Sequence, residues 1–379
     1  MRCWIGSLFV LFLATGILLG KQFHKIKQKQ KVVYRAFKQM RYATNNETHF
    51  LGNAPTPFRL INLLPGEVQG IVVQVKQVNI RHVTPYNPSL IQTDSGYALF
   101  FRYDVMSSKS KVTPFFPSIG VVHLNDKFEQ NDQEFKRVDL QTDYAEDPRI
   151  IEVGDQLYLF YNDLDQNFGG RFMSLANLNK ETYEVNYITA LDMNLQQTEK
   201  NWSPFEYTDE HQTAHLFLEY RIHPRKLLQL PNPQTNDFLN ITLPRNASFL
   251  PLAWPLKWGE IRGGTPAKKI GNEYLGFFHS CFTEENGLVW FTMGAYTFEA
   301  NPPFRLTGIS KHPILFRGIF DTPVSHTAPI DKRVIYPGGF IFEKEKELVH
   351  VACGENDCGI KIVTMDLKKL KESLFKLDN

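Results

Sequence analysis

The sequence predicts an all-β fold, a five-bladed β-propeller, and three observations support this prediction. Helical periodicity is almost absent before the C-terminal end, and short alternating or aromatic-rich runs are interrupted by turn residues throughout. A hairpin unit of polar motif, strand, polar turn and aromatic strand recurs five times between residue 70 and about residue 365. Its turns come roughly every 55–75 residues, the period of propeller blades that carry insertions. A β-sandwich with coincidental hairpins is the alternative.

The hairpins also predict where functional side chains gather. The strand pairs are 87–92 with 97–102, 147–153 with 156–161, 201–207 with 213–220, 265–270 with 273–279, and 337–342 with 347–353. In a propeller, the first strand of each blade lines the central channel, and the antiparallel second strand returns to the same mouth. Arg, Lys, His and Asp at that mouth would suit a polar or anionic ligand. The residues expected to converge are Asn87, Arg102, Asp147, Asn162, Lys200, Arg221, Arg262, His279, Gly338 and Asp357.

Composition narrows the classes of partner. The chain has 379 residues and is 42% hydrophobic, which is enough for one large core or two ordinary ones. A formal net charge of +2 gives no strong field, so we expect no nucleic-acid partner. No CxxC pair or histidine spacing indicates a metal site. Cys353 and Cys358 could form a disulfide or remain free thiols, and the oligomeric state is left open.

The two ends of the chain differ from the β-rich body. Residues 1–21 contain a long uncharged run, which predicts a single-pass membrane anchor in preference to a cleaved signal peptide. Lysines after this run would keep the rest of the chain in the cytosol. The short segment before the run is instead typical of a type II membrane protein of the secretory pathway, the Golgi or the cell envelope. Residues 22–66 are expected to form a stem and linker, 67–365 the propeller, and 366–379 an amphipathic helix packed on it.

Motifs in all five hairpins resemble those of one carbohydrate-active family. The chain resembles the inverting β-mannoside phosphorylases of glycoside hydrolase family 130 and the related five-bladed mannosyl transferases. The resemblance covers about three quarters of the chain, in the expected order and spacing. The motifs are Asn87-Pro88 with Arg102, Glu146-Asp-Pro-Arg149, Lys200-Asn-Trp202, Arg262-Gly-Gly-Thr-Pro266 with His279, and Tyr336-Pro-Gly-Gly339 followed by Gly354-Glu-Asn-Asp357.

The resemblance implies roles for these residues. It makes Asp147 the proton donor, acting through a sugar hydroxyl, and it implies a glycan substrate with inorganic phosphate or a sugar 1-phosphate as co-substrate and no cofactor. It places Asp357 against the donor sugar. Insertions such as 220–244 depart from the family pattern and leave sugar and acceptor open. The implied phosphate-binding residues are Arg102, Arg149, Lys200 and His279, and the remaining sugar-binding candidates are Asn87, Asn201, Trp202 and Arg262.

The residue types favour phosphorolysis over hydrolysis. An inverting glycosidase needs a carboxylic acid and a second carboxylate that activates water. A phosphorylase needs only the acid, together with cations that hold phosphate in line. The predicted mouth offers one motif carboxylate, Asp147, beside several cations. We therefore expect burial to raise the pKa of Asp147 and keep it protonated, although alternation would place Arg149 on the same face and oppose this.

Two other functions and several simpler explanations remain open from the sequence. The chain could be a membrane-anchored glycosyltransferase that uses a nucleotide-sugar or sugar-phosphate donor, or a non-catalytic carbohydrate-binding propeller. Asp147 could simply form a turn, and His279 could be a core histidine. Lys200-Asn-Trp202 could be a solvated turn with a packing tryptophan, and Arg262-Gly-Gly264 a tight turn.

Overall fold

The computed structural model describes residues 60, 62–106, 115–165, 170–191, 198–241, 254–324 and 332–377. The predicted anchor, residues 1–21, and most of the predicted stem and linker lie outside these ranges. None of the helices within the described ranges combines the length and the apolar character needed to cross a bilayer. The described chain is mostly β-structure.

Three four-stranded antiparallel sheets follow one another along the chain, and each is called a blade here. All three begin with a strand that the sequence predicted as the first of a hairpin. Blade 1 contains β2 (Tyr86–Thr93), β3 (Gly96–Met106), β4 (Phe115–Leu124) and β5 (Lys136–Arg137). Blade 2 contains β6 (Glu146–Val153), β7 (Gln156–Leu164), β8 (Arg171–Leu178) and β9 (Val185–Leu191). Blade 3 contains β10 (Ser203–Thr208), β11 (Ala214–Arg221), β12 (Lys226–Leu230) and β13 (Leu239–Ile241).

A ten-stranded sheet holds the last two blades. Its halves are joined by parallel pairing between β17 and β19. The short 3₁₀ helices η2 (Leu256–Trp258) and η3 (Lys344–Lys346) precede β14 and β20. Blade 4 contains β14 (Glu260–Gly263), β15 (Lys268–Ile270), β16 (Glu273–Thr283), β17 (Val289–Glu299) and β18 (Leu306–Ser310). Blade 5 contains β19 (Lys332–Glu343), β20 (Leu348–Glu355), β21 (Gly359–Asp366) and β1 (Val72–Val78).

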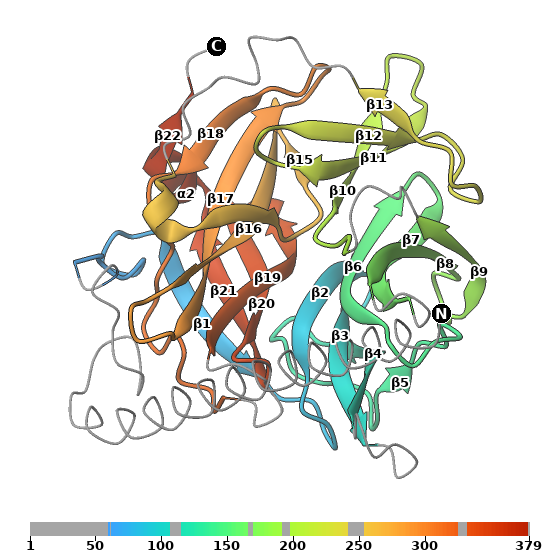
Figure 1. The fold of residues 1–379 in the computed structure, drawn as a ribbon, viewed down its shortest axis with the longest axis horizontal. Coiled ribbons are helices and arrows are strands. Elements are labelled where there is room, and N and C mark those ends of the chain that lie inside the picture. The colour runs from blue at the N-terminus through green and yellow to red at the C-terminus, as the bar shows by residue number, and fades with distance from the viewer. Residues whose placement is uncertain are drawn as a thin grey trace, which may run out of the picture.

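The first strands of the blades face one another around a common centre. Strand β2 contacts β6 and β19, β6 contacts β10, and β16 contacts β19. A parallel bridge from Phe205 to Ala267 links blade 3 to blade 4 and completes the circuit. Figure 1 shows β2, β6 and β19 near the middle of the molecule and β5, β9 and β13 toward its outside. The fold is therefore propeller-like. Strand β1, the first described strand of the chain, pairs with β21 in the last blade.

The hydrophobic core lies between neighbouring blades. Successive side chains of a strand point to opposite faces, and here both faces are covered. Leu90 packs with Ile341 of blade 5, whereas the next residue, Ile91, packs with Ile150 of blade 2. Because each sheet is buried on both sides, its strands read as nearly continuous apolar runs.

The C-terminal prediction needs correction. Helix α2 covers only Leu367–Ser373, and Leu374–Lys376 form strand β22, which pairs with β18 of blade 4. Asp366 caps the helix by accepting a hydrogen bond from the backbone nitrogen of Lys369 at 2.8 Å. The helix ends early because the strand buries Leu374 on blade 4 and satisfies its backbone there. Cys281, Cys353 and Cys358 are free thiols, so the possible Cys353–Cys358 disulfide is absent.

We predict that Gly338→Ala destabilises the fold at the contact between blades 5 and 1. A Cβ atom at Gly338 would overlap the backbone oxygen of Pro88, which follows Asn87. Overpacking of this kind costs about 1–3 kcal/mol, to be measured as the free energy of unfolding in urea. Gly271→Asn is the control, because Gly271 has open space around it and a φ of 69° that Asn tolerates. Equal losses in both variants would contradict the expectation.

Candidate active site

Three blades begin with the same unusual backbone conformation. Asn87, Asp147 and Asn201 have φ angles of 45°, 55° and 65°, in the left-handed region that Asn and Asp enter more readily than most residues. In blades 1 and 2 the pairing register shifts at these residues, so that two residues oppose one. Such a β-bulge redirects a side chain out of the regular alternation. Asp147 therefore shapes the local backbone, which agrees with the alternative that it forms a turn. Its side chain also points toward a cavity.

A cavity of about 430 Å³ lies where the first strands of the blades begin. Every blade contributes to its lining. It brings together eight of the ten residues assigned to the site from the sequence. These are Asn87, Arg102, Asp147, Lys200, Asn201, Arg262, His279 and Asp357.

The carboxyl group of Asp147 is held by two donors. Asn87 Nδ2 donates to its Oδ1 at 2.8 Å, and Arg102 Nη1 lies 3.3 Å from the same atom. In the described part of the chain, no hydrogen bond ends on Oδ2. Burial alone would raise the pKa of Asp147, but the charge of Arg102, the hydrogen bond from Asn87 and the charge of Lys200 hold it well below its usual value. The expectation that Asp147 is protonated at rest is therefore wrong.

Arg102 is occupied by carboxylates. Its Nη2 lies 2.8 Å from Glu146 Oε1, while its Nη1 pairs with Asp147. Its guanidinium also lies over the ring of Tyr86, 4.9 Å from the ring centroid. Because both terminal nitrogens of the guanidinium already pair with carboxylates, Arg102 is better placed to position Asp147 than to bind a phosphate.

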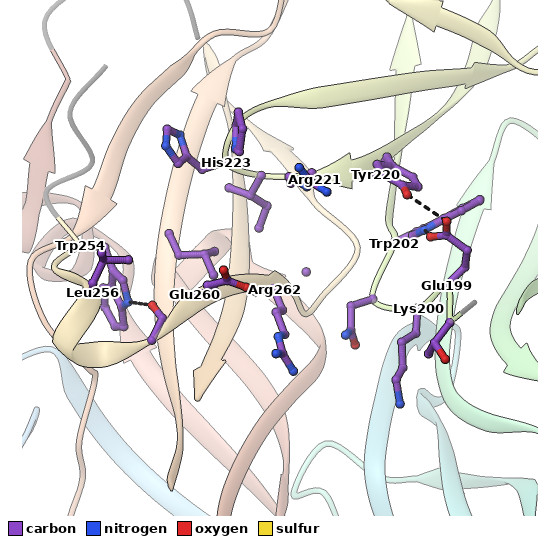
Figure 2. Close-up of a pocket in the computed structure, with 17 residues that line it drawn as sticks. Glu199, Lys200, Trp202, Tyr220, Arg221, His223, Trp254, Leu256, Glu260 and Arg262 are labelled. Atoms are coloured by element: carbon purple, nitrogen blue, oxygen red, sulfur yellow. Dashed lines mark hydrogen bonds between the residues drawn. The ribbon is translucent and has the colours of Figure 1, made fainter. Parts of the chain in front are cut away.

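Lys200 and Arg262 are the cations of this cavity that stay unpaired. Within the ranges the structure describes, neither makes a hydrogen bond or an ion pair, whereas Arg171 pairs with Glu146 and Lys332 with Asp357. Figure 2 shows the Lys200 and Arg262 side chains extending in the same direction, away from Tyr220 and His223. Because Lys200 and Arg262 are exposed and unpaired, an anion bound between them would be attracted more strongly than at the paired cations of the cavity.

Arg149 lies beneath the cavity instead of lining it. Its guanidinium is fully buried and donates to the backbone oxygens of Gly264 at 2.7 Å and Gly263 at 3.1 Å. It also donates to Asn201 Oδ1 at 3.3 Å and to the Tyr336 hydroxyl at 2.5 Å. The bulge at Asp147 breaks the alternation that would have put both side chains on one face. Arg149 thus fastens blade 2 to blades 3, 4 and 5, which differs from the phosphate contact that the resemblance implied.

His279 is buried but not satisfied. Only 2% of its surface is exposed, and its Nδ1 has no hydrogen-bond partner within the described residues. Its ring lies against Tyr336, with the centroids 4.8 Å apart. Burial, followed by the charges of Arg149 and Arg262, lowers the pKa of His279 to about 3. The imidazole is therefore neutral and offers a hydrogen bond, not the positive charge expected from the sequence.

Trp202 is a core residue, as the simpler explanation held. It is 1% exposed and packs with Leu216 and Leu228 of blade 3. Its indole nitrogen donates to Glu199 Oε2 at 3.3 Å. A ring so covered has no face left for a sugar to stack on, so its predicted sugar contact is not provided by this arrangement.

Some of the residues expected to converge lie elsewhere. Asn162 is fully buried and donates to the backbone oxygen of Glu146 at 3.3 Å. Gly338 packs against Pro88, and Arg221 lines a neighbouring cavity. Arg221 ends β11 as predicted, whereas Asn162 and Gly338 lie inside β7 and β19, because these strands extend beyond the predicted bounds.

Two carboxylates of the cavity, Glu146 and Asp104, had no predicted role. Glu146 Oε1 lies 2.6 Å from Arg171 Nη2, in addition to its pairing with Arg102. Asp104 accepts a hydrogen bond from Tyr86 Oη at 2.8 Å. The third carboxylate beside Asp147, Asp357, was predicted, but its pairing with Lys332 was not. Glu146 was visible in the motif that contains Asp147. Arg171 and Lys332 lie outside the predicted hairpins and left no local signal.

No protein-family model matches the sequence, and no curated protein sequence matches it. Solved structures do resemble the fold. A β-1,2-mannobiose phosphorylase from Listeria innocua has 15% sequence identity and a TM-score of 0.52, over 81% of this chain and 97% of that chain. A mannose phosphorylase from Leishmania mexicana, in complex with a phosphate ion, has 12% identity and a TM-score of 0.53, over 83% of this chain and 94% of that chain. The chain shares the fold of these phosphorylases.

This likeness confirms the predicted resemblance at the level of fold. A glycosyl hydrolase from Bacteroides ovatus is also similar, with 13% identity and a TM-score of 0.50, over 76% of this chain and 85% of that chain. Because one fold supports different reactions at such low identity, the reaction has to be argued from the side chains of the cavity.

We predict that His279→Gln flattens the dependence of stability on pH. The pKa of His279 is about 3 in the folded protein and about 6.5 in the unfolded chain. Between these values the unfolded chain binds the extra proton, so the free energy of unfolding falls as the pH falls, by up to about 1.4 kcal/mol per pH unit for this group.

The measurement is urea unfolding of both proteins between pH 6.5 and 5. His223 and His350, whose pKa values burial also lowers, are present in both proteins and cancel in the difference. Parallel curves for wild type and variant would contradict the neutral state of His279.

Proposed function

We propose that this protein is an inverting glycoside phosphorylase acting on β-mannosides, or a transferase that runs the same reaction from a sugar 1-phosphate. One observation supports this most strongly. The ionised acid Asp147, with Oδ2 unbonded in the described structure, shares a cavity with two unpaired cations, Lys200 and Arg262. The solved structures of similar fold include phosphorylases of β-1,2-mannobiose and of mannose, which supports the choice of sugar.

The other carboxylates of the cavity are poor candidates for a base that activates water. Glu146 is paired with two arginines, Asp357 with Lys332, and Asp104 accepts from Tyr86. Inverting hydrolysis needs a second carboxylate that is free to take a proton from water. An incoming phosphate needs no such base, because it is already an anionic nucleophile. The pairing pattern therefore favours phosphorolysis over hydrolysis.

In the proposed reaction, phosphate bound by Lys200 and Arg262 attacks the anomeric carbon. The new carbon–oxygen bond to phosphate forms as the glycosidic bond on the opposite face breaks. The leaving oxygen takes a proton from Asp147, directly or through a sugar hydroxyl. The products are a sugar 1-phosphate of inverted configuration and the free acceptor. Asn87 and Arg102, which fix Oδ1, would orient the carboxyl group for this step.

The ionised resting state of Asp147 fits this reaction if phosphate binds first. Hydrogen phosphate brings a proton that it loses on becoming a phosphate ester, so the overall reaction needs no net proton. Its negative charge would also offset the cations that lower the pKa of Asp147, so the acid could hold a proton once the anion is bound. The cations that keep Asp147 ionised would thereby favour binding of phosphate before binding of the glycan.

The test is to incubate the purified protein with mannose 1-phosphate, GDP-mannose or short β-mannosides plus phosphate. The proposal expects phosphate release from mannose 1-phosphate with an acceptor sugar, and mannose 1-phosphate formation from mannosides. GDP release would instead indicate a nucleotide-sugar transferase. No turnover of any donor, with retained glycan binding, would indicate a carbohydrate-binding propeller.

We expect Asp147→Asn to lower turnover by about 10²–10⁴-fold, because the general acid is lost. Asn keeps the left-handed backbone preference and the size of the side chain, so the bulge should persist. Phosphate affinity, measured by calorimetry, should remain or improve, because a negative charge beside the cations is removed. The matched control is Asp155→Asn in the exposed β6–β7 turn, which should leave turnover unchanged. Turnover of Asp147→Asn near the wild-type rate would exclude the assigned role.

A further inference from the structure

A second, larger cavity of about 600 Å³ adjoins the first. The two share Lys200, Asn201 and Arg262, so the proposed phosphate-binding cations lie at their junction. The second cavity lies between blades 3 and 4, and its walls come from residues 198–202, 220–224 and 254–263 (Figure 2). A molecule reaching from the first cavity past these cations would therefore enter the second.

The lining combines polar groups with a small apolar surface. Arg221 and Glu260 are exposed and, in the described part of the chain, make no side-chain hydrogen bond or ion pair. Leu256 is 85% exposed, although most large apolar side chains here are buried. Free charged groups beside an apolar surface match a sugar ring, whose hydroxyls surround a ring with apolar C–H faces.

One wall of the cavity is held rigidly. Glu199 is 4% exposed and accepts hydrogen bonds from the Tyr220 hydroxyl at 2.9 Å and from Trp202 Nε1 at 3.3 Å. Figure 2 shows Glu199, Trp202 and Tyr220 together on one side, with Trp254 and Leu256 on the other. Because these side chains are already fixed, a ligand that binds here loses less free energy to the ordering of protein side chains.

The aromatic residues of this cavity do not favour a nucleobase. A base is usually stacked on an exposed aromatic face. Trp202 and Trp254 are almost fully buried. Tyr220 is covered by Lys226, whose Nζ lies 4.3 Å from the ring centroid, and packs on Trp202 at 5.3 Å. The volume also exceeds what one sugar ring would fill and falls in the range that encloses ligands of several rings.

We propose that the second cavity binds the acceptor part of the glycan as a chain of two or more sugar residues. Arg221 and Glu260 contact its hydroxyl groups, and Leu256 packs against a ring face. The glycosidic bond then lies near the shared wall at Lys200, Asn201 and Arg262. This inference rests on the proposed function for its reaction, but the binding it describes can be measured without turnover.

The test uses the non-reacting variant Asp147→Asn and β-linked mannose oligomers of two, three and four residues. Calorimetry should show affinity rising at least tenfold from the dimer to the tetramer. Adding Arg221→Ala or Glu260→Gln to this variant should remove most of that gain, while affinity for inorganic phosphate stays within twofold. Lys180→Ala on blade 2 is the surface control and should preserve the full gain.

Three results would overturn the inference. The first is an affinity that does not rise with the length of the oligomer. The second is a rise that persists in both Arg221→Ala and Glu260→Gln. The third is binding of GDP in place of the oligomers, with a GDP affinity that Arg221→Ala lowers. Failure of the proposed reaction would look different, because oligomers would still bind in a length-dependent way while the wild-type protein released no product. Thermal unfolding of each variant confirms that lost binding does not reflect a lost fold.

Discussion

The buried guanidinium of Arg149 is the interaction on which the site depends. It reaches from blade 2 to the backbone of Gly263 and Gly264, to Asn201 and to Tyr336, and so ties four blades together below the cavity. In the described structure backbone oxygens, and not a carboxylate, stabilise its charge. Removing one partner from such a buried charged network is strongly destabilising, so the geometry of the mouth and the stability of the ring are coupled.

The charge of Arg149 also contributes to the electrostatics above it. For His279, burial lowers the pKa most, and Arg149 is the charge that lowers it most. For Asp147, burial raises the pKa, and Arg102, the hydrogen bond from Asn87 and Lys200 lower it more than Arg149 does. The result is an ionised acid and a neutral imidazole in one cavity with two unpaired cations. This combination favours binding of an anion. In the proposed reaction, a bound phosphate would reduce the repulsion between Lys200 and Arg262 and would allow Asp147 to take up a proton. Arg149 thus contributes both to the junction of the blades and to the charge of the cavity.

The hairpins and most residues of the mouth could be predicted because strand pairing is local. A motif, a turn and an aromatic strand fix which residues begin and end each hairpin, and Asn87, Asp147, Arg102 and His279 follow from that alone. The direction of Arg149 could not be predicted, because it depends on a bulge that replaces simple alternation. Glu146 was assigned no role because its partner Arg171 begins a third strand with no distinctive motif. The sign of the pKa shift of Asp147 was predicted incorrectly. Burial was expected to outweigh Arg149, but Arg102, the hydrogen bond from Asn87 and Lys200, which lower the pKa more, were not considered.

A crystal structure of the wild-type protein grown with inorganic phosphate tests the central claim most directly. The account predicts one phosphate in the first cavity, bonded to both Lys200 and Arg262, with Arg149 still donating to Gly263 and Gly264. A phosphate bound to Arg149, or a cavity that stays without anion at a concentration that saturates binding in solution, would contradict it.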